Sequence, residues 1–555
     1  MSLINENHIE EEALSWFEQL GYKIYHQLSP DDTKPERESY KDVYLLNRLK
    51  NNIKKLNPEL NEDNITNVVN KILKSESPTL VEENQRLHKY MVEGIDLEIN
   101  DKTGNRRTHK IKIIDFDNPE NNEWFAVNQF TVNQGVYSRK PDIVVFINGL
   151  PVSVIELKNP SSEDTNIESA YNQLQTYKSQ IPTLFNTNLA LVISDGILAR
   201  IGSLTANFER FMPWRTIIDN NQANGTNQKN ILELETLIKE FFNKCVFLDV
   251  LHNFTAFIND KNEDSQGVYK IIAGYHQYYA VKKAIDNTII ATQPNGSRKV
   301  GVVWHTQGSG KSYLMAFYVG QLVINKNLKN PTIVVITDRN DLDYQLFNTF
   351  AKFTSLIRQT PKQTTSREDL KNVLLSQASG GIIFATIQKF SASDDSNKFP
   401  ILSDRSNIIV IADEAHRTQY GFKAKINTKT GVMDYGFAKY MRDALPNAAF
   451  IGFTGTPIEN NDKNTKQIFG DYIDIYDISK AVADGATVSL HYESRLAKLE
   501  LDEEEKNNID KAIAELSNYD TNEEIELSKS FKIQEALVGS QERISMIASD
   551  LNKAL

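Results

Sequence analysis

Cysteine is almost absent from this sequence, since Cys245 is the only one among 555 residues. A single cysteine cannot form a disulfide within the chain, so we expect a reducing compartment, the cytoplasm. Long apolar runs are also missing, because no stretch reaches the roughly 18 to 20 residues that a membrane helix needs. The start, MSLINENHIEEE, lacks the basic and then apolar pattern of a secretory signal. We therefore predict a protein that has no contact with a membrane.

An excess of positive charge is missing as well. Asp and Glu number 73 against 62 Lys and Arg, which gives a formal net charge of −11. This balance excludes a uniformly basic coat for nucleic acid but leaves room for a local basic groove. The hydrophobic share of 40% and the charged share of 24% are ordinary for globular proteins. A chain of 555 residues is long enough for about three domains.

The apolar patterns differ between the two ends of the chain. Residues 141–158 (PDIVVFINGLPVSVIELK) hold two β-branched runs around Asn148-Gly149-Leu150-Pro151, which predicts a hairpin, and helical patterns cover about 9–20 and 166–180. A turn-rich stretch at 258–267 separates this part from a series of short apolar runs, VGVVWH, TIVVIT, GIIFAT, NIIVIAD and AAFIGFT. Such runs alternating with helices predict a parallel, doubly wound α/β sheet.

Three charged residues fall at one end of the predicted hairpin. Asp142 opens its first strand, while Glu156 and Lys158 are two residues apart in the second strand and so share a face. Two carboxylates can hold Mg²⁺ against a phosphate, and a lysine beside them can position the attacking water and offset charge. The residues match the PD-(D/E)xK nuclease pattern. The alternative is a hairpin with solvated, charged ends.

Further candidates lie on the two predicted helices. Gln173 and Tyr177 are four residues apart and share a helical face. They resemble the QxxxY element of RecB-like and type I restriction nucleases, in the place after the ELK strand that this family requires; otherwise they are an ordinary half-exposed pair. Glu11 and Glu12, on the opening helix, would add a metal contact as first-helix acids do in some members. The alternative for both is a solvated face.

A phosphate-binding loop follows the strand VGVVWH. Its residues are Thr306, Gln307, Gly308, Ser309, Gly310, Lys311 and Ser312. The glycines let backbone N–H groups surround a phosphate at a helix N-terminus, Lys311 reaches the β- and γ-phosphates, and Ser312 can ligate Mg²⁺. His305 stands where the full GxxxxGK[ST] pattern has its first glycine, a change that superfamily 2 helicases tolerate. The segment predicts ATP binding.

An acidic pair supplies the second half of an ATP site. Asp413 and Glu414 follow the buried run NIIVIA, so we expect Asp413 to hold Mg²⁺ and Glu414 to orient and deprotonate the attacking water. The spelling DEAH, with His416, is that of a superfamily 2 helicase, and we expect His416 to couple the nucleotide state to the next motif. Related motors place an adenine-reading glutamine about where Gln277 stands.

Three further segments resemble helicase elements. Thr454-Gly455-Thr456-Pro457 resembles the element that links hydrolysis to DNA movement, and its alternative is a plain turn after a strand. Thr337-Asp338-Arg339 and the segment around Lys389 resemble contacts with the DNA backbone, which hydroxyls, amides and basic side chains can make without reading sequence.

Taken in order, these motifs resemble the restriction (R) subunit of type I restriction-modification enzymes across about residues 9–500. The resemblance implies a PD-(D/E)xK endonuclease domain at 1–260, a first RecA-like helicase domain at 261–475 and the start of a second RecA-like domain at 476–555. It also implies ATP and Mg²⁺ as cofactors, and partners that comprise double-stranded DNA and the modification methyltransferase and specificity subunits. Such a subunit moves duplex DNA with ATP and cuts both strands far from the recognition site.

Alternatives remain open at this stage. Only 98 residues follow Pro457, so we expect a fragment that lacks most of a second lobe and does not translocate alone. A nuclease–helicase fusion in DNA repair or phage defence, with no methyltransferase partner, would carry the same motifs. A DNA-binding scaffold with a silent nuclease fold is the non-enzymatic alternative.

Overall fold

The computed structural model describes residues 6–100, 106–159, 166–216, 232–260, 267–337, 340–390, 401–415, 425–426, 433–434, 437–456, 463–488 and 545–550. The chain divides into two compact units, Met1–Val488 and Ser489–Leu555. In the second unit only 545–550 is described, and it is helical. Most of the predicted start of a second lobe, 476–555, lies outside the described residues.

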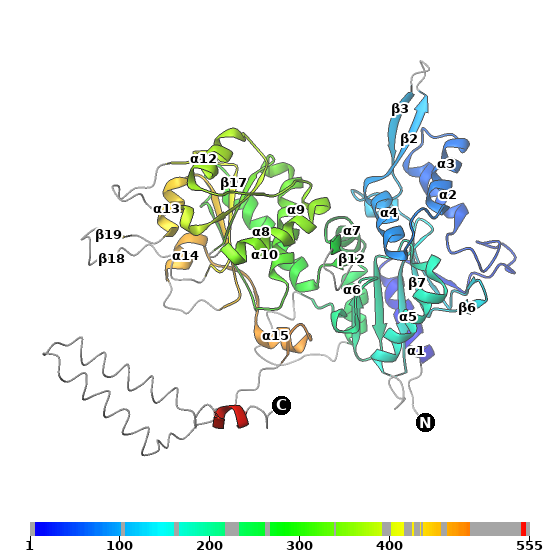
Figure 1. Ribbon diagram of the computed structural model, residues 1–555. Helices are drawn as coiled ribbons and strands as arrows, with labels where there is room; N and C mark the ends of the chain where they lie inside the picture. Colours follow the sequence, from blue (N-terminus) through cyan, green and yellow to red (C-terminus); the bar gives the residue numbers. More distant parts are fainter. Residues whose placement is uncertain are drawn as a thin grey trace. The chain divides into compact units, whose positions relative to one another are not determined.

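A six-stranded mixed sheet organises the first part of the chain (Figure 1). Its strands, in spatial order, are β1 (Lys23–His26), β4 (Trp124–Asn128), β7 (Ile143–Ile147), β8 (Leu150–Leu157), β9 (Ala190–Ser194) and β10 (Ala199–Gly202). β7 and β8 run antiparallel and β8 and β9 parallel. Every residue of β7, β8 and β9 is buried, which explains why their sequences are apolar almost throughout.

The predicted hairpin is confirmed, with a shorter turn than the sequence suggested. Asn148 and Gly149 alone form the turn, with φ values of 53° and 87°, and β8 begins at Leu150. Two successive residues at positive φ match the right-handed twist of the flanking strands, which is why Asn-Gly is favoured there. The Asn148 amide also donates to the carbonyl of Ile113 at 2.9 Å, so the turn is tied to the rest of the fold.

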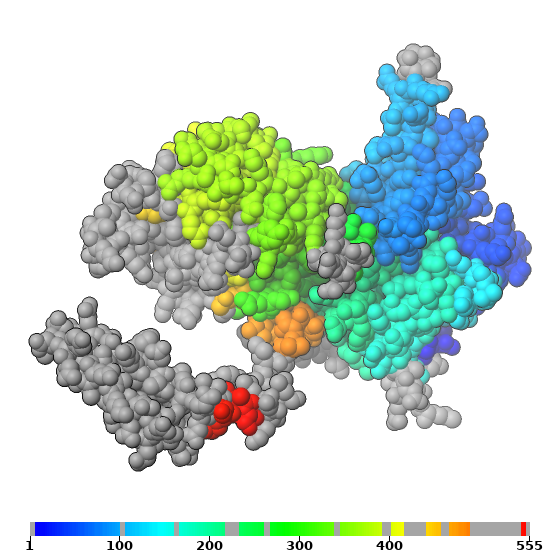
Figure 2. Space-filling view, viewed as in Figure 1, coloured from blue at the N-terminus to red at the C-terminus, as the bar shows by residue number. Residues whose placement is uncertain are grey.

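Helices and small ribbons surround the six-stranded sheet. α1 (Glu6–Gln19) and α5 (Ile167–Gln180) confirm the two predicted helices and contact the sheet. The other elements of this part are α2 (Leu46–Leu56), α3 (Glu62–Leu73), α4 (Leu80–Glu93), η1 (Pro119–Asn121), η2 (Pro182–Phe185), η3 (Phe208–Arg210), α6 (Glu233–Phe241), α7 (Lys244–Asn253) and the ribbons β2–β3 (Ile95–Asn100, Arg106–Ile111) and β5–β6 (Val132–Gln134, Tyr137–Arg139). Figure 2 shows β2–β3 standing out from the surface.

A seven-stranded, entirely parallel sheet follows, in the order β15, β16, β14, β17, β20, β13, β21. The strands are β13 (Lys299–His305), β14 (Thr332–Thr337), β15 (Lys362–Gln363), β16 (Ile382–Thr386), β17 (Ile408–Ala412), β20 (Ala449–Thr454) and β21 (Tyr472–Tyr476). All five apolar runs singled out in the sequence are strands of this sheet. The prediction of a parallel α/β sheet is therefore confirmed.

The remaining elements accompany this sheet. They are β11 (Thr255–Asp260), β12 (Gly267–Ile272), α8 (Tyr275–Thr292), α9 (Lys311–Ile324), η5 (Lys326–Leu328), α10 (Asn340–Lys352), α11 (Thr354–Ile357), α12 (Arg367–Ser376), η6 (Ile387–Phe390), β18 (Lys425–Ile426), β19 (Met433–Asp434), α13 (Phe437–Ala444), α14 (Lys463–Phe469) and α15 (Ile478–Ala483). In the part of the chain that the structure describes, no helix combines the length and apolar character needed to cross a membrane.

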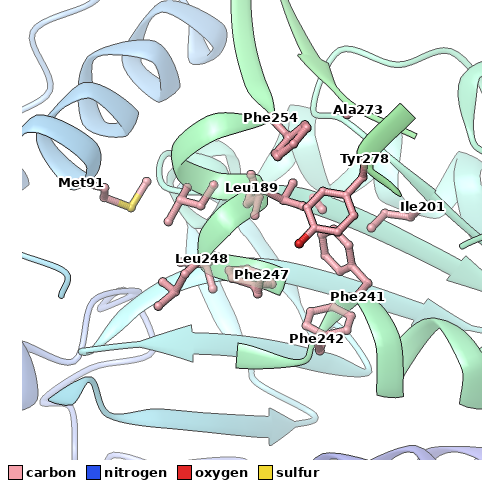
Figure 3. Packing of buried hydrophobic residues seen from close by; sticks show 14 of the residues in the cluster. Met91, Leu189, Ile201, Phe241, Phe242, Phe247, Leu248, Phe254, Ala273 and Tyr278 are labelled. Atoms are coloured by element: carbon pink, nitrogen blue, oxygen red, sulfur yellow. The ribbon is translucent and has the colours of Figure 1, made fainter. Parts of the chain in front are cut away.

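One buried apolar cluster runs from α1 to α15, and a second packs β17 and its neighbours against α12 and α13. The first cluster joins the surroundings of both sheets. In Figure 3, Ile201 of β10 and Phe241 of α6 lie near Tyr278 of α8. The two ends of the stretch predicted to be turn-rich at 258–267 belong to strands, because β11 continues to Asp260 and β12 begins at Gly267, and the two pair as an antiparallel ribbon. Residues 261–266 lie outside the described residues. The domain boundaries at 260 and 475 stay predictions.

Candidate functional site

Asp142, Glu156 and Lys158 lie together at the end of the β7–β8 hairpin. All three side chains are buried, with Glu156 fully so. Asp142 Oδ2 accepts a hydrogen bond from the Leu157 backbone N–H at 2.8 Å, and Lys158 Nζ donates to Glu156 Oε1 at 2.7 Å. These contacts hold the two carboxylates and the lysine in one small region, as the sequence predicted.

Burial and mutual repulsion govern the electrostatics of this cluster. Burial raises the pKa of Asp142 to about 6, against the opposing effect of the Leu157 N–H and of Lys158. Burial, and to a smaller extent the nearby Asp142 carboxylate, raise the pKa of Glu156 to about 8. Lys158 alone therefore does not neutralise the two acids, and a proton or a second cation is needed near neutral pH.

A further observation indicates that this cluster could bind a divalent cation. Oε2 of Glu156 is buried and accepts no hydrogen bond from the described residues. An anionic oxygen left in this state is costly, and a hard cation would satisfy it. Asp142 and Glu156 are two oxygen donors rather than a larger set: within the described ranges, no three or more His, Cys, Asp or Glu side chains come together as a metal cluster. The donor set fits an oxygen-preferring ion such as Mg²⁺ that keeps several of its waters.

Gln173 and Tyr177 point to one another on α5, where the Gln173 amide donates to the Tyr177 hydroxyl at 2.5 Å. Tyr177 is buried, and burial raises the pKa of its hydroxyl. The negative charges of Glu156 and Asp142 raise the pKa of the Tyr177 hydroxyl as well, so this hydroxyl interacts electrostatically with both carboxylates. The structure thus brings the two α5 residues to the hairpin cluster.

Glu10 on α1 is a component that the sequence reading missed. Its side chain is buried, and it accepts hydrogen bonds from the side-chain amides of Asn128 and Gln129. Gln129 in turn donates to Asp142 Oδ1 at 3.4 Å. Glu11 and Glu12 are exposed instead, which is their solvated-face alternative. The available signal was the helical phase, because Glu10 falls on the buried face of α1 with Ile9, Ala13 and Leu14, while Glu11 and Glu12 do not.

The phosphate-binding loop runs from β13 into α9. Gly308 and Gly310 have φ values of 83° and 82°, a left-handed conformation that favours glycine. Thr306 and Ser309 are buried, and the Ser309 hydroxyl donates to the Thr306 carbonyl at 2.6 Å. Lys311 and Ser312 begin α9, so the loop ends at a helix N-terminus as predicted.

His305 accounts for the missing first glycine. It ends β13 with its side chain fully buried, and its Nε2 lies 2.9 Å from Asp474 Oδ2 of β21. His305 is not among the residues with positive φ in the described part of the chain, so this position does not require glycine. The histidine ties the start of the loop to the neighbouring strand.

Gln277 and its neighbour contact the same loop from α8. The Gln277 amide donates to the Gly310 carbonyl at 3.1 Å, and its Oε1 accepts from the Gly274 N–H at 3.0 Å. His276 Nε2 lies 3.1 Å from the Ser309 carbonyl, and burial lowers the pKa of His276 to about 4, so the ring is neutral at physiological pH. Gln277 thus supports the phosphate loop, and its reading of adenine stays a prediction.

The acidic pair faces Lys311. Burial lowers the pKa of Lys311, and the negative charges of Glu414 and Asp413 oppose this effect. The Asp413 N–H donates to the Ile336 carbonyl at 2.9 Å, which fixes the end of β17 to β14. Glu414 has a φ of 50°, a strained conformation for a non-glycine residue of the kind found at functional sites.

The Thr454–Thr456 segment lies between the strand that leads into the phosphate loop and the strand that ends at the acidic pair. β20 pairs with β13 on one side and with β17 on the other. A Cβ atom added to Gly455 would lie 2.7 Å from Lys311 Nζ, and the Thr454 hydroxyl accepts from the Thr456 N–H at 3.1 Å. This motif therefore borders the phosphate loop directly.

The other predicted DNA contacts are only partly described. Thr337 is buried at the end of β14, where its backbone pairs with Thr386. Lys389 is half-buried and donates to the Thr364 carbonyl. Arg339 and His416 lie outside the described residues. The DNA-contact roles of these residues stay predictions.

Two family models match the chain. The type I restriction enzyme R protein N terminus matches residues 4–210, and the SWI2/SNF2 ATPase matches residues 276–526. The second match, the parallel sheet and the glycine-rich loop define a helicase-like ATPase of superfamily 2, and they support the use of ATP.

The relatives are type I restriction enzyme endonuclease subunits. That of HindI from Haemophilus influenzae is 43% identical over 553 residues, which is 99% of this chain and 51% of the relative. The putative MjaIXP subunit from Methanocaldococcus jannaschii is 36% identical over 522 residues, 90% of this chain and 47% of the relative. The chain therefore belongs to the family of type I restriction enzyme endonuclease (R) subunits. It spans about half the length of these curated relatives.

Solved structures resemble the chain less. The helicase domain of Hef from Pyrococcus furiosus is 16% identical, with a TM-score of 0.27 over 48% of this chain and 55% of that one.

Proposed function

We propose that this chain carries the nuclease and the first ATPase lobe of a type I restriction endonuclease subunit. The subunit would move duplex DNA with ATP and cut both strands far from the recognition site, in a complex with modification methyltransferase and specificity subunits. The observation that carries the proposal is the buried cluster of Asp142, Glu156 and Lys158 on adjacent strands, beside Tyr177. Buried acids with raised pKa values in one place are typical of a catalytic site.

The nuclease chemistry follows from what each residue can do in a PD-(D/E)xK fold. Asp142 and Glu156 would hold Mg²⁺, which supplies Lewis-acid polarisation of the scissile phosphate when bound. Lys158 is held by Glu156 and would position the attacking water and stabilise charge that develops on the phosphate. Tyr177, fixed by Gln173, would orient the substrate or Lys158 through its hydroxyl. Glu10 would keep Asp142 in place through Gln129.

The ATPase chemistry uses the second site. The loop Thr306–Ser312 would bind the β-phosphate with its backbone N–H groups, and Lys311 would neutralise the β- and γ-phosphates. Ser312 and Asp413 would hold the Mg²⁺ that accompanies ATP, and Glu414 would orient the attacking water. Thr454 and Thr456 lie between the strands that carry these groups, so they would pass the nucleotide state to the DNA-contact residues Thr337, Arg339 and Lys389, with His416 as a link.

A cleavage experiment tests the proposal. The full-length parent of this chain is combined with its methyltransferase and specificity subunits and a plasmid that carries the recognition site. We expect cleavage that requires ATP and Mg²⁺ and is lost in both Asp142→Ala and Lys311→Ala, while Glu11→Gln, on the exposed side of α1, cuts normally. Cleavage that survives Lys311→Ala and ignores the methyltransferase would instead favour a free-standing nuclease–helicase fusion. Cleavage that survives Asp142→Ala would show that this hairpin is not the nuclease site.

A further inference from the structure

Asp484 lies at the centre of a buried polar cluster just after α15. Its side chain is 1% exposed, and its Oδ1 accepts a hydrogen bond from Arg215 Nε at 2.6 Å. Its Oδ2 accepts from two hydroxyls, that of Tyr275 at 2.6 Å and that of Tyr476 at 2.8 Å. A buried carboxylate is stable only while its partners stay in place, so these four side chains form one unit.

One side of this unit reaches the six-stranded sheet. Arg215 Nη1 lies 3.6 Å from Glu233 Oε1 at the start of α6, and Glu233 Oε2 pairs with Arg200 of β10. Charges of alternating sign therefore run from β10 to Asp484. Trp214, next to Arg215, packs against Phe241 and Tyr278, with ring centroids 4.9 and 5.9 Å away. Figure 3 shows the latter two in the same apolar cluster.

The other side reaches the phosphate loop. The Tyr476 ring stacks on His276, with centroids 4.2 Å apart and an interplanar angle of 9°. His276 Nε2 meets the Ser309 carbonyl at 3.1 Å, and the Tyr476 carbonyl accepts from the Thr306 N–H at 2.9 Å. Two residues of the phosphate loop are thus held by groups that Asp484 fixes.

We propose that Asp484 is a positioning residue that couples the phosphate loop to the six-stranded sheet. Movement of the loop on nucleotide binding displaces Tyr476 and His276. Loss of one hydrogen-bond partner would leave the buried Asp484 carboxylate unsatisfied, so Asp484 moves with Tyr476 and the displacement reaches Arg215 and Glu233. Coupling between two sites is reciprocal, so a change at Arg215 alters the loop in turn. The inference rests on the proposed function in one respect, that the loop binds ATP.

The first test needs no nucleotide. Hydrogen exchange of the amides at 306–312 is compared in the chain and in Arg215→Met and Asp484→Asn. We expect both variants to exchange several-fold faster there, and Tyr275→Phe, which removes a single hydroxyl, to act in the same direction with less risk to folding. Lys239→Gln is the matched control, since it removes a half-buried ion pair with Glu235 on the helix that carries Glu233. Unchanged exchange at 306–312 in Arg215→Met and Tyr275→Phe overturns the proposal.

The second test adds ATP with Mg²⁺. In the unmodified chain we expect slower exchange at 306–312 and also at 199–216, and in Asp484→Asn only the first effect, with ATP affinity at least about 5-fold lower, the lower end of usual coupling factors. Protection of 306–312 without any change at 199–216 in the unmodified chain overturns the proposed coupling through Asp484, while it still supports ATP binding at the phosphate loop. Absence of protection at 306–312 counts against the proposed ATP site, and the first test still decides the role of Asp484.

Discussion

Lys158 contacts only one of the two Glu156 carboxyl oxygens: Nζ donates to Oε1 at 2.7 Å, while Oε2 is buried with no hydrogen-bond partner among the described residues. The free oxygen lies in a cluster where Asp142 adds a second negative charge. The lysine and a metal ion therefore do not compete for the same atom. Each can take one oxygen of the carboxylate, which is what a site that binds a cation beside a permanent lysine requires.

Removal of the lysine tests this division of roles. In the reconstituted complex, Lys158→Ala is expected to lower the cleavage rate by about 10²–10³-fold, the usual loss when one group that stabilises transition-state charge is removed. Metal binding should be retained, because Asp142 and Glu156 remain. Calorimetric titration with Mg²⁺ and a cleavage time course measure the two effects. Loss of metal binding together with cleavage would contradict the separate roles.

The pH dependence of stability follows from the raised pKa of Glu156. In the unfolded chain this carboxyl has its ordinary pKa, and in the folded, metal-free chain the pKa is about 8. The folded state thus binds the proton more tightly, and this contribution to stability is full below the ordinary glutamate pKa and is lost as pH rises through about 8.

Melting temperatures of Glu156→Gln and the unmodified chain, both in EDTA, test this dependence. We expect the melting temperature of the variant to rise relative to that of the unmodified chain from pH 5 to pH 9. Mg²⁺ should reverse the trend for the unmodified chain only. A pH-independent difference would contradict a buried, protonated Glu156.

Glu10 is expected to support the metal site from outside it. Glu10→Gln leaves the shape but removes the charge that orients Gln129 toward Asp142. We predict Mg²⁺ affinity weaker by about 10-fold, as for other residues that orient metal ligands. Glu11→Gln and Glu12→Gln are matched controls on the same helix with exposed side chains, and both should bind Mg²⁺ normally. Equal losses in all three variants would indicate a general charge effect.

Gly455 limits the space around the phosphate-loop lysine. In Gly455→Ala the new methyl group would lie 2.7 Å from Lys311 Nζ and 3.0 Å from Gln307 Cγ, so both side chains must move. We expect ATP turnover to fall by roughly 10-fold, since a misplacement of about 1 Å costs up to 10²-fold. Gly267→Ala, where a Cβ meets nothing within 4 Å, is the control. The measurement is steady-state ATP hydrolysis by the full-length parent with DNA present, and normal turnover in Gly455→Ala would count against the close approach.

Gly149 is predicted to be essential for stability. Its φ is +87°, and a Cβ there would lie 2.7 Å from the Leu45 carbonyl oxygen, a backbone atom that cannot rotate away. Strain and overlap together suggest that Gly149→Ala costs roughly 2–4 kcal/mol of unfolding free energy. Gly135→Ala also has a positive φ, +58°, but meets nothing within 4 Å, so about 1 kcal/mol is expected. Urea unfolding compares the two, and equal losses would show that the contact with Leu45 does not matter.

Much of the fold could be predicted from local patterns. The five apolar runs became strands of one parallel sheet because each is short and uninterrupted, as a strand buried on both faces requires. The hairpin was predictable from Asn148-Gly149, where only the length of the turn was wrong. The order of strands could not be obtained in this way, since no local pattern states that β20 lies between β13 and β17.

In the candidate sites, too, local motifs were predictable from the sequence and long-range contacts were not. Asp142, Glu156 and Lys158 could be singled out because a hairpin brings the two strand ends together, and Lys311 because it ends a glycine-rich loop at the start of a helix. Glu10 was missed because its importance depends on Asn128 and Gln129, more than a hundred residues away. Asp484 was missed for the same reason, since its contact with Arg215 spans 269 positions. Contacts of this range are set by the packing of whole elements.

The two-residue turn at Asn148 and Gly149 also bears on the tolerance of the chain to insertions and deletions. Together with the register shift between Val145 and Phe146, this turn sets the register in which Ile143 pairs with Ile155, and that register places Asp142 beside the Leu157 N–H. Side chains alternate along a strand, so a shift of one residue would turn Glu156 to the opposite face of the sheet, away from Tyr177. A loop length that usually varies freely is therefore constrained here, and a single inserted codon at this turn would displace the side chains of the proposed nuclease site.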